Sequence, residues 1–252
     1  MAINGTGPAS ARKAGGWLET VKTIVYAVLI ALGIRTIAFE PFNIPSGSMI
    51  PTLLVGDYLF VSKYSYGYSR HSLPFSLPLI PGRVLFREPA RGDVVVFKLP
   101  RDNSTDYIKR LVGLPGDRLQ MRAGVLHING QPVQRRLIGD YISPDDGRER
   151  ARAFIETLPG GRSHQIIEET DSGPLDNTPE YVVPAGHYFA MGDNRDSSFD
   201  SRVIAGVGYV PKENLVGRAE FLFFSTNGQA RLWEVWKWPW AVRWDRLFQG
   251  IN

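Results

Sequence analysis

One apolar stretch near the N-terminus limits the architectures open to this chain. Residues 17–39 read WLETVKTIVYAVLIALGIRTIAF, and the eleven residues from Ile24 to Ile34 carry no charge. A helix that spans a bilayer needs about 20 mostly apolar residues. The charged residues Glu19, Lys22 and Arg35 lie near the ends, where long side chains can reach the headgroups. The stretch therefore predicts one transmembrane helix over residues 17–39.

Two other interpretations of this stretch fit the residues less well. A cleaved signal peptide ends in small residues at alternate positions, and ALGIRTIAF has no clear motif of that kind. A buried amphipathic helix would place polar residues at every third or fourth position, and residues 24–34 contain none at that spacing. A membrane anchor remains the best interpretation.

Basic residues predict the orientation of this anchor. Arg12, Lys13 and Lys22 lie on its N-terminal side, whereas residues 40–60 contain no Lys or Arg. Basic flanks stay on the cytoplasmic side of a membrane. We therefore expect residues 1–16 to form a disordered cytoplasmic tail, and residues 40–252 to lie on the outer side.

The rest of the chain is typical of a mostly β domain. Aromatic and β-branched runs bounded by Gly, Pro and Asp predict many short strands. Ala-Gly and Asn-Gly links divide residues 117–136 into a three-stranded meander. Residues 140–163 are charged and irregular, and we expect a surface excursion there. The other predicted strands are 57–63, 93–99, 107–112, 164–170, 181–183, 187–191, 206–210 and 218–224.

The C-terminal tail, residues 231–252, contains five of the six tryptophans among Lys and Arg residues. Indole rings favour the headgroup region of a bilayer, so the tail could dock on a membrane. It could equally form a strand or helix that packs on the β domain. The sequence leaves both possibilities open.

Composition excludes several kinds of site. The chain has no cysteine, which rules out disulfides, thiolate metal sites and a cysteine nucleophile. The net charge is only +4 and the basic residues are scattered, so no nucleic-acid surface is predicted. The four histidines, His71, His127, His164 and His187, do not have the spacing of metal ligands.

A loop that follows the anchor carries two hydroxyls in a stiffened setting. It reads PSGSMIP over residues 45–51, with Pro45 and Pro51 at its ends. By composition alone it is a linker. As a site it would need a base to activate a serine, and a lysine can serve where burial lowers its pKa. Lys109 lies within the apolar strand YIKRLV, and Lys98 in VVVFKL is a rival.

Four motifs together resemble bacterial type I signal peptidase, the leader peptidase that cleaves signal peptides from exported proteins. They are PSGSMIPTL, RGDVVVFK, YIKRLVGLPGD and GDNRDSSFDSR, in that order behind the anchor. The resemblance implies a mostly β fold of coiled antiparallel sheets, a serine endopeptidase and no metal or cofactor. It implies secretory preproteins and the lipid bilayer as partners, and a periplasmic catalytic domain on the inner membrane.

The resemblance also implies a role for each matching residue. Ser48 corresponds to the nucleophile and Lys109 to the general base. Ser46 corresponds to an oxyanion-hole donor, together with the backbone N–H of Ser48. The supporting residues are Ser198, which would orient the lysine, and an ion pair of Asp200 and Arg202, with Asp193 and Arg195 in the same motif.

Two alternatives stay open at this point. A serine-lysine protease could mature one dedicated substrate rather than precursors in general. A membrane-anchored β protein without catalysis could bind exported chains through an exposed sheet edge. The second alternative gives no reason for Ser48 and Lys109 to meet.

Overall fold

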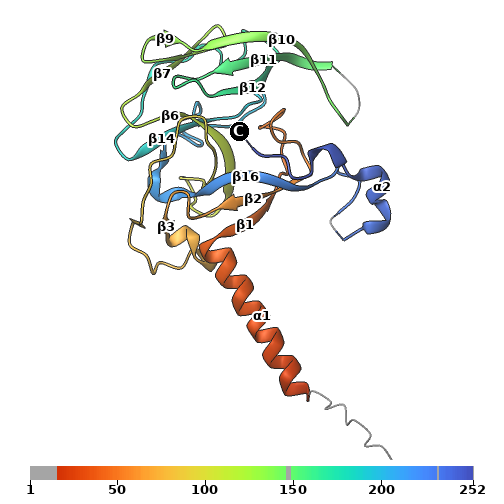
Figure 1. The fold of residues 1–252 in the computed structure, drawn as a ribbon. Coiled ribbons are helices and arrows are strands. Elements are labelled where there is room, and N and C mark those ends of the chain that lie inside the picture. The colour runs from red at the N-terminus through yellow and green to blue at the C-terminus, as the bar shows by residue number, and fades with distance from the viewer. Residues whose placement is uncertain (1–15, 146–148, 232, 252) are drawn as a thin grey trace, which may run out of the picture.

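The computed structural model describes residues 16–145, 149–231 and 233–251 of the 252-residue chain. Most of the predicted cytoplasmic tail, with Arg12 and Lys13, lies outside these residues. One long helix, α1, is followed by a β domain (Figure 1). The helices and strands are α1 (Trp17–Ile37), β1 (Phe39–Asn43), β2 (Asp57–Ser62), β3 (Tyr68–Ser69), β4 (Arg83–Val84), β5 (Val94–Lys98), β6 (Asp106–Gly113), β7 (Arg118–Arg122), β8 (Val125–Ile128), β9 (Gln131–Pro132), β10 (Gln134–Ile142), β11 (Glu149–Thr157), β12 (Ser163–Glu168), β13 (Tyr181–Val182), β14 (His187–Met191), β15 (Val210–Pro211), β16 (Leu215–Ser225) and α2 (Trp238–Ala241).

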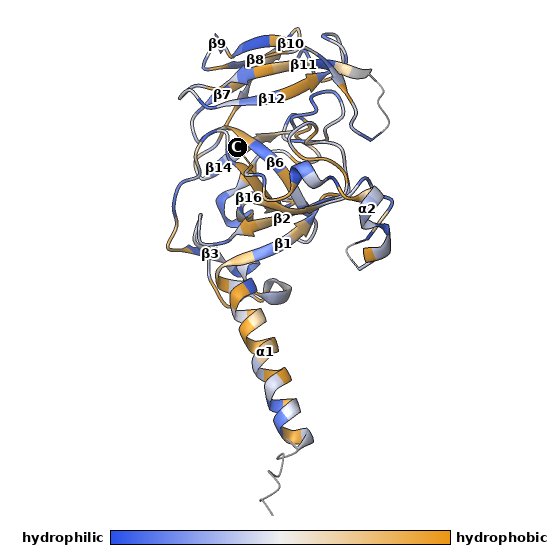
Figure 2. Ribbon diagram, turned by 45° about the vertical axis from the view of Figure 1, so that its right-hand side comes forward, coloured by the Kyte–Doolittle hydropathy of each residue, from blue (hydrophilic) through white to orange (hydrophobic). Residues whose placement is uncertain are grey.

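Helix α1 projects away from the β domain as an apolar rod (Figure 2). None of its 21 residues is buried against the rest of the protein. At 1.5 Å per residue its length is about 30 Å, which is the thickness of the hydrocarbon core of a bilayer. The helix is thus long and apolar enough to cross a membrane, and an exposed apolar rod of this kind would be unstable in water.

The β domain confirms the predicted fold class. Seven strands form one curled antiparallel sheet in the order β1-β2-β16-β5-β6-β14-β15. A smaller sheet, β13-β7-β8-β9, contains the predicted meander. Both of its two-residue links have positive φ angles, at Ala123 and Gly124 and at Asn129 and Gly130. Positive φ at both central residues is the requirement of a type I′ turn.

The expectation of irregular structure over residues 140–163 is wrong, because residues 140–142 and 149–157 are strand. They belong to a three-stranded antiparallel sheet, β10-β11-β12. The alternation that marks a strand is obscured in the sequence by charge. Glu156 is buried inside this sheet because Arg195, from outside it, donates both guanidinium nitrogens to its carboxylate, at 2.8 and 2.5 Å.

The predicted strand at 206–210 is largely wrong as well. Only Val210 of that segment is in a strand, Gly206 lies in a turn, and Gly208 has a positive φ. A Cβ on Gly206 would lie 2.1 Å from the ring of Phe199, so the aromatic ring occupies the space of a side chain there. This close approach, rather than strand pairing, explains the glycine.

The tryptophan-rich tail is held to the β domain by backbone hydrogen bonds to β16 and by its arginines. Arg246 Nη2 donates to the carbonyl of Thr52 at 3.0 Å and to Asp57 at 2.6 Å. Packing on the domain accounts for Trp238, whose ring centroid lies 5.0 Å from that of Phe224. The other four indoles, Trp233, Trp236, Trp240 and Trp244, are 57–80% exposed.

We predict that Glu156→Gln destabilises the domain by about 3–5 kcal/mol, because it leaves the buried Arg195 guanidinium without a counter-charge. Burial alone would raise the pKa of Glu156, but Arg195 and His164 hold it well below its usual range. Chemical unfolding in detergent, followed by tryptophan fluorescence, measures the loss. Arg118→Gln removes an exposed pair with Glu180 and serves as the control. Equal stability of Glu156→Gln and the wild type would contradict the prediction.

Candidate active site

The serine loop is fixed by apolar anchors just after its hydroxyls. Met49 and Leu53 are fully buried in a core cluster with Leu59 and Val61 of β2. Burying one such side chain contributes about 1.5–3 kcal/mol. Because Met49 is the next residue after Ser48, its burial restricts where the Ser48 side chain can point.

A second segment holds the carbonyls of this loop. The backbone N–H of Asn194 donates to the Ser48 carbonyl at 3.1 Å, and its side-chain Nδ2 donates to the Gly47 carbonyl at 3.1 Å. Asn194 is held in turn by β12, because Ile167 N donates to Asp193 O and Arg195 N donates to Ile167 O. Both carbonyls thus have hydrogen-bond donors, whereas the N–H of Ser48 has no hydrogen-bond partner among the described residues.

Lys109 reaches the serine loop from β6. Its Nζ lies 2.6 Å from Ser48 Oγ in a hydrogen bond, and 3.0 Å from the carbonyl of Ile108. Lys109 and Ser48 are both buried. The neighbouring Arg110 points to the other face of the strand, where it forms a buried ion pair with Asp193 at 2.8 Å. The alternation of a β-strand therefore separates the two cations.

Burial lowers the pKa of Lys109 to about 8, against the opposing effect of two carboxylates, Asp200 and Asp193. Each carboxylate has its own arginine. Arg202 pairs with Asp200 at 2.9 Å, as Arg110 does with Asp193. Because these charges are already compensated, they raise the pKa of the amine less than bare carboxylates would. An appreciable fraction of Lys109 is thus neutral near pH 8 and able to accept a proton.

The rival lysine is committed elsewhere. Lys98 Nζ pairs with Asp106 at 2.8 Å and donates to the carbonyl of Ser104 at 2.9 Å. Among the described residues no histidine contacts Ser48. His164, for example, lies 3.4 Å from Glu156 inside the neighbouring sheet. Lys109 is therefore the titratable group that the fold brings to the serine.

A groove opens beside this pair. Its volume is about 650 Å³. Two chain segments, 42–48 and 106–109, form its walls, and Ser46 lies on its lining with an exposed side chain. Among the described residues, residues 106–109 of β6 pair with β5 alone, because β14 pairs with β6 only from Arg110 onward. The edge that residues 106–109 present to the groove is therefore open to another strand. The groove is lined by Phe42, Asn43, Ile44, Pro45, Ser46, Gly47, Ser48, Val96, Asp106, Tyr107, Ile108, Lys109, Asn194, Ser197 and Phe199.

Ser198 is buried close to the pair but does not bind the amine in this conformation. Among the described residues, the hydrogen bonds of Lys109 Nζ go to Ser48 and Ile108 only. A Cβ on Gly192 would lie 2.2 Å from Ser198 Oγ and 2.4 Å from the Ser48 carbonyl. Gly192 therefore allows Ser198 and Ser48 to pack on the same point of the backbone.

Sequence reasoning missed three residues that position the site: Asn194, Gly192 and Arg110. All lie within or beside motifs that it quoted, so their presence was visible. Their roles were not, because they act through contacts between distant segments: Asn194 and Gly47 are 147 positions apart, and Arg110 and Asp193 are 83 apart. A glycine next to an aspartate is ordinary in a turn, and only the closeness of Ser48 and Ser198 makes Gly192 necessary.

The chain matches known proteins over most of its length. A family model described as signal peptidase, peptidase S26 covers residues 17–224. Signal peptidase I of Rickettsia typhi is 44% identical over 255 residues, which cover 92% of this chain and 95% of that protein. Signal peptidase I of Rickettsia canadensis is 44% identical over 248 residues, or 91% of this chain and 92% of that protein. A crystal structure of a signal peptidase I from Enterococcus faecalis V583 is 30% identical and covers 52% of this chain and 97% of its own, with a TM-score of 0.31.

We predict that the nucleophilicity of Ser48 depends on pH through Lys109. Below a pKa of about 8 the amine is protonated and cannot accept the hydroxyl proton, so the rate of acylation should fall about tenfold per pH unit. The measurement is the rate at which a serine-directed acylating reagent modifies Ser48 between pH 6 and 10. A rate that is flat across this range would contradict the assignment of a titrating amine.

We also predict that Gly192→Ala slows the same modification by about 10²-fold, because the new methyl group would displace Ser48 or Ser198. Gly116→Ala is the control, since no atom lies within 4 Å of a Cβ at that position. Gly116 has a positive φ, so alanine strains the backbone there and the control is destabilised as well. Unchanged acylation in a folded Gly192→Ala protein would show that the close packing is dispensable.

Proposed function

The chain belongs to the peptidase S26 family of signal peptidases, serine endopeptidases that remove signal peptides, and we propose that its residues Ser48 and Lys109 carry out the cleavage. The observation that supports this assignment is the 2.6 Å hydrogen bond between Lys109 Nζ and Ser48 Oγ, in a buried setting that favours the neutral amine. The earlier alternative of a β protein without catalysis does not agree with the family.

The reaction begins with a precursor strand in the groove. The cleavage region of the precursor lies extended along the open edge of residues 106–109, where backbone hydrogen bonds add it to the sheet. The groove is largely apolar near the serine, with Ile44, Val96 and Ile108 in its walls. Small side chains close to the scissile bond fit such a wall, whereas large ones would clash with it.

The chemistry proceeds in two steps. Lys109 takes the proton of the Ser48 hydroxyl, and Oγ attacks the scissile carbonyl carbon. The oxyanion accepts hydrogen bonds from the Ser48 N–H and from Ser46 Oγ, and losing one such donor costs about 3 kcal/mol of barrier. The protonated lysine then gives its proton to the leaving amine, which becomes the new N-terminus of the mature protein.

The second step releases the signal peptide. Neutral Lys109 takes a proton from water, and the resulting hydroxide attacks the ester carbon. The Ser48–acyl bond breaks, and Lys109 passes its proton to Oγ. The signal peptide leaves as a carboxylic acid, which loses its remaining proton to water. Ser198 is the buried hydroxyl available to orient the amine, and the pair of Asp200 and Arg202 holds the backbone around Gly192.

The membrane assignment also belongs to this proposal. Helix α1 crosses the inner membrane once with its N-terminus in the cytoplasm, and residues 40–252 form the periplasmic catalytic domain. This orientation is supported by Lys22 on the N-terminal side and by the lack of Lys and Arg over residues 40–60. Only ten residues separate the end of α1 at Ile37 from Ser48, so the serine stays near the bilayer surface, where a signal peptide also ends its apolar segment.

We predict that Ser48→Ala and Lys109→Ala each lower the cleavage of an alanine-x-alanine signal peptide substrate by about 10⁴-fold or more. Lys109→Arg should fail as well, because a guanidinium does not lose its proton at working pH. The full-length protein in detergent is assayed by peptide release and checked for folding by tryptophan fluorescence.

The matched control is Lys98→Met, which removes the rival lysine and its ion pair without touching the dyad. Full activity in Lys109→Ala together with loss in Lys98→Met would reassign the base. A panel of different precursors then separates a general signal peptidase from a protease dedicated to one substrate.

A further inference from the structure

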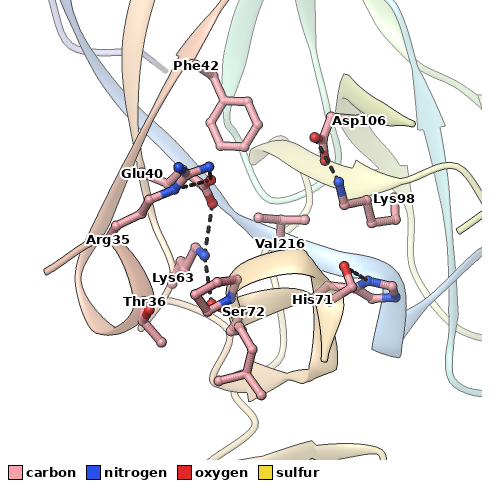
Figure 3. Close-up of a pocket in the computed structure, with 13 residues that line it drawn as sticks. Arg35, Thr36, Glu40, Phe42, Lys63, His71, Ser72, Lys98, Asp106 and Val216 are labelled. Carbon is pink, nitrogen blue, oxygen red and sulfur yellow. Dashed lines mark hydrogen bonds and ion pairs between the residues drawn. The ribbon is translucent and has the colours of Figure 1, made fainter. Parts of the chain in front are cut away.

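Three charged residues join the anchor helix to the β domain (Figure 3). Arg35, in the last turn of α1, binds Glu40 through Nε at 2.9 Å and Nη2 at 2.5 Å. Lys63, just after β2, binds the other carboxylate oxygen of Glu40 at 2.8 Å and also donates to the Ser72 carbonyl at 2.8 Å. Glu40 itself lies in β1. We call Arg35, Glu40 and Lys63 the junction triad.

Burial within the triad is graded from the domain to the helix. The Lys63 side chain is 3% exposed, that of Glu40 13%, and that of Arg35 62%. A buried ammonium is costly unless it is paired, so Lys63 holds Glu40 firmly to the β domain. Glu40 then offers its second oxygen to the helix. The carboxylate is thus a fixed point of the domain to which the end of the helix is attached.

Two backbone contacts restrict the same joint. Tyr68 Oη donates to the Ile37 carbonyl at 2.8 Å, and Lys63 N donates to the Ala38 carbonyl at 2.9 Å. The last carbonyls of a helix have no partner within it. Here one is bound by the domain, so the helix cannot swing about Ala38 without losing these contacts.

The joint is also continuous with the catalytic groove. A small cavity of about 140 Å³ lies beside the triad. Phe42 and Asp106 line this cavity, and the same two residues line the groove beside Ser48. The triad therefore sets where the groove lies relative to the helix.

We propose that the junction triad is a positioning device, which fixes the angle of the membrane anchor so that the groove meets signal peptides at the bilayer surface. This inference rests on the proposed function. Its residues act through placement and touch no reacting atom. The triad therefore matters for a substrate that is itself held in the membrane, and not for a soluble peptide that can diffuse to the groove.

The test compares two substrates with full-length protein in lipid vesicles. One is a soluble peptide with an alanine-x-alanine cleavage region, and the other is a preprotein whose signal peptide is inserted in the same vesicles. Glu40→Gln and Lys63→Met should keep kcat/KM for the peptide within about twofold of the wild type, but lower it for the preprotein on the order of tenfold. Lys63→Met leaves the anchor sequence unchanged, so altered membrane insertion cannot explain its effect.

Controls come from a pair of the same length and similar burial that does not touch the helix. Arg91 and Asp117 pair at 2.8 Å with side chains 14% and 10% exposed. Arg91→Met and Asp117→Asn should leave the ratio of the two rates as in the wild type. The proposal is overturned if both triad variants keep the wild-type ratio, or if the controls shift it as much. A wild type that cleaves neither substrate would contradict the proposed function instead.

A structural readout keeps the proposal testable if a triad variant loses activity altogether. The chain has no cysteine, so Gln131→Cys in β9, at the end of the domain opposite α1 (Figure 1), gives one labelling position. Energy transfer from a dye there to acceptors in the bilayer reports the height and tilt of the domain. Glu40→Gln should broaden the distribution of domain heights and tilts in a folded protein, and an unchanged distribution overturns the proposal.

Discussion

The proposed role of Lys109 as the base depends on removing its amine from water. In water the amine would be protonated at neutral pH and could not accept a proton. Burial between β6 and the serine loop reverses this preference, and the two nearby carboxylates do not restore it because Arg110 and Arg202 already neutralise them. The arginines thus contribute to catalysis indirectly, by limiting how far Asp193 and Asp200 raise the pKa of the lysine.

The same requirement explains why the site is built from distant segments. A buried amine needs cover on every side, and no single loop supplies it. The serine loop is anchored by Met49 and Leu53, its carbonyls are bound by Asn194, and Asn194 is held by β12. The three-stranded sheet that contains β12 therefore supports the serine loop, although it lies outside the curled sheet that carries Lys109.

Sequence alone indicated the anchor, the mostly β class and the two residues that meet in the site, since apolar length, alternation and motif order are all local signals. It could not choose between Lys98 and Lys109 by burial, because both lie in apolar strands. The choice depends on Asp106, which pairs across the sheet with Lys98. Residues 140–163 were misjudged for a similar reason: a charge such as Glu156 suggests solvent unless its partner, Arg195, is known. Long-range ion pairs are the information that one sequence does not display.

The segment that follows α1 is not a free, extended chain. Enzymes of this family cut signal peptides, which carry an apolar segment. This chain also carries an apolar segment near its N-terminus, α1. The segment after α1, however, is already engaged, because Phe39–Asn43 is paired residue by residue with β2. Residues paired in this sheet cannot enter the groove of another molecule unless those strand pairs break first. The pairing of β1 with β2 thus distinguishes α1 from an apolar segment that is followed by an unpaired chain.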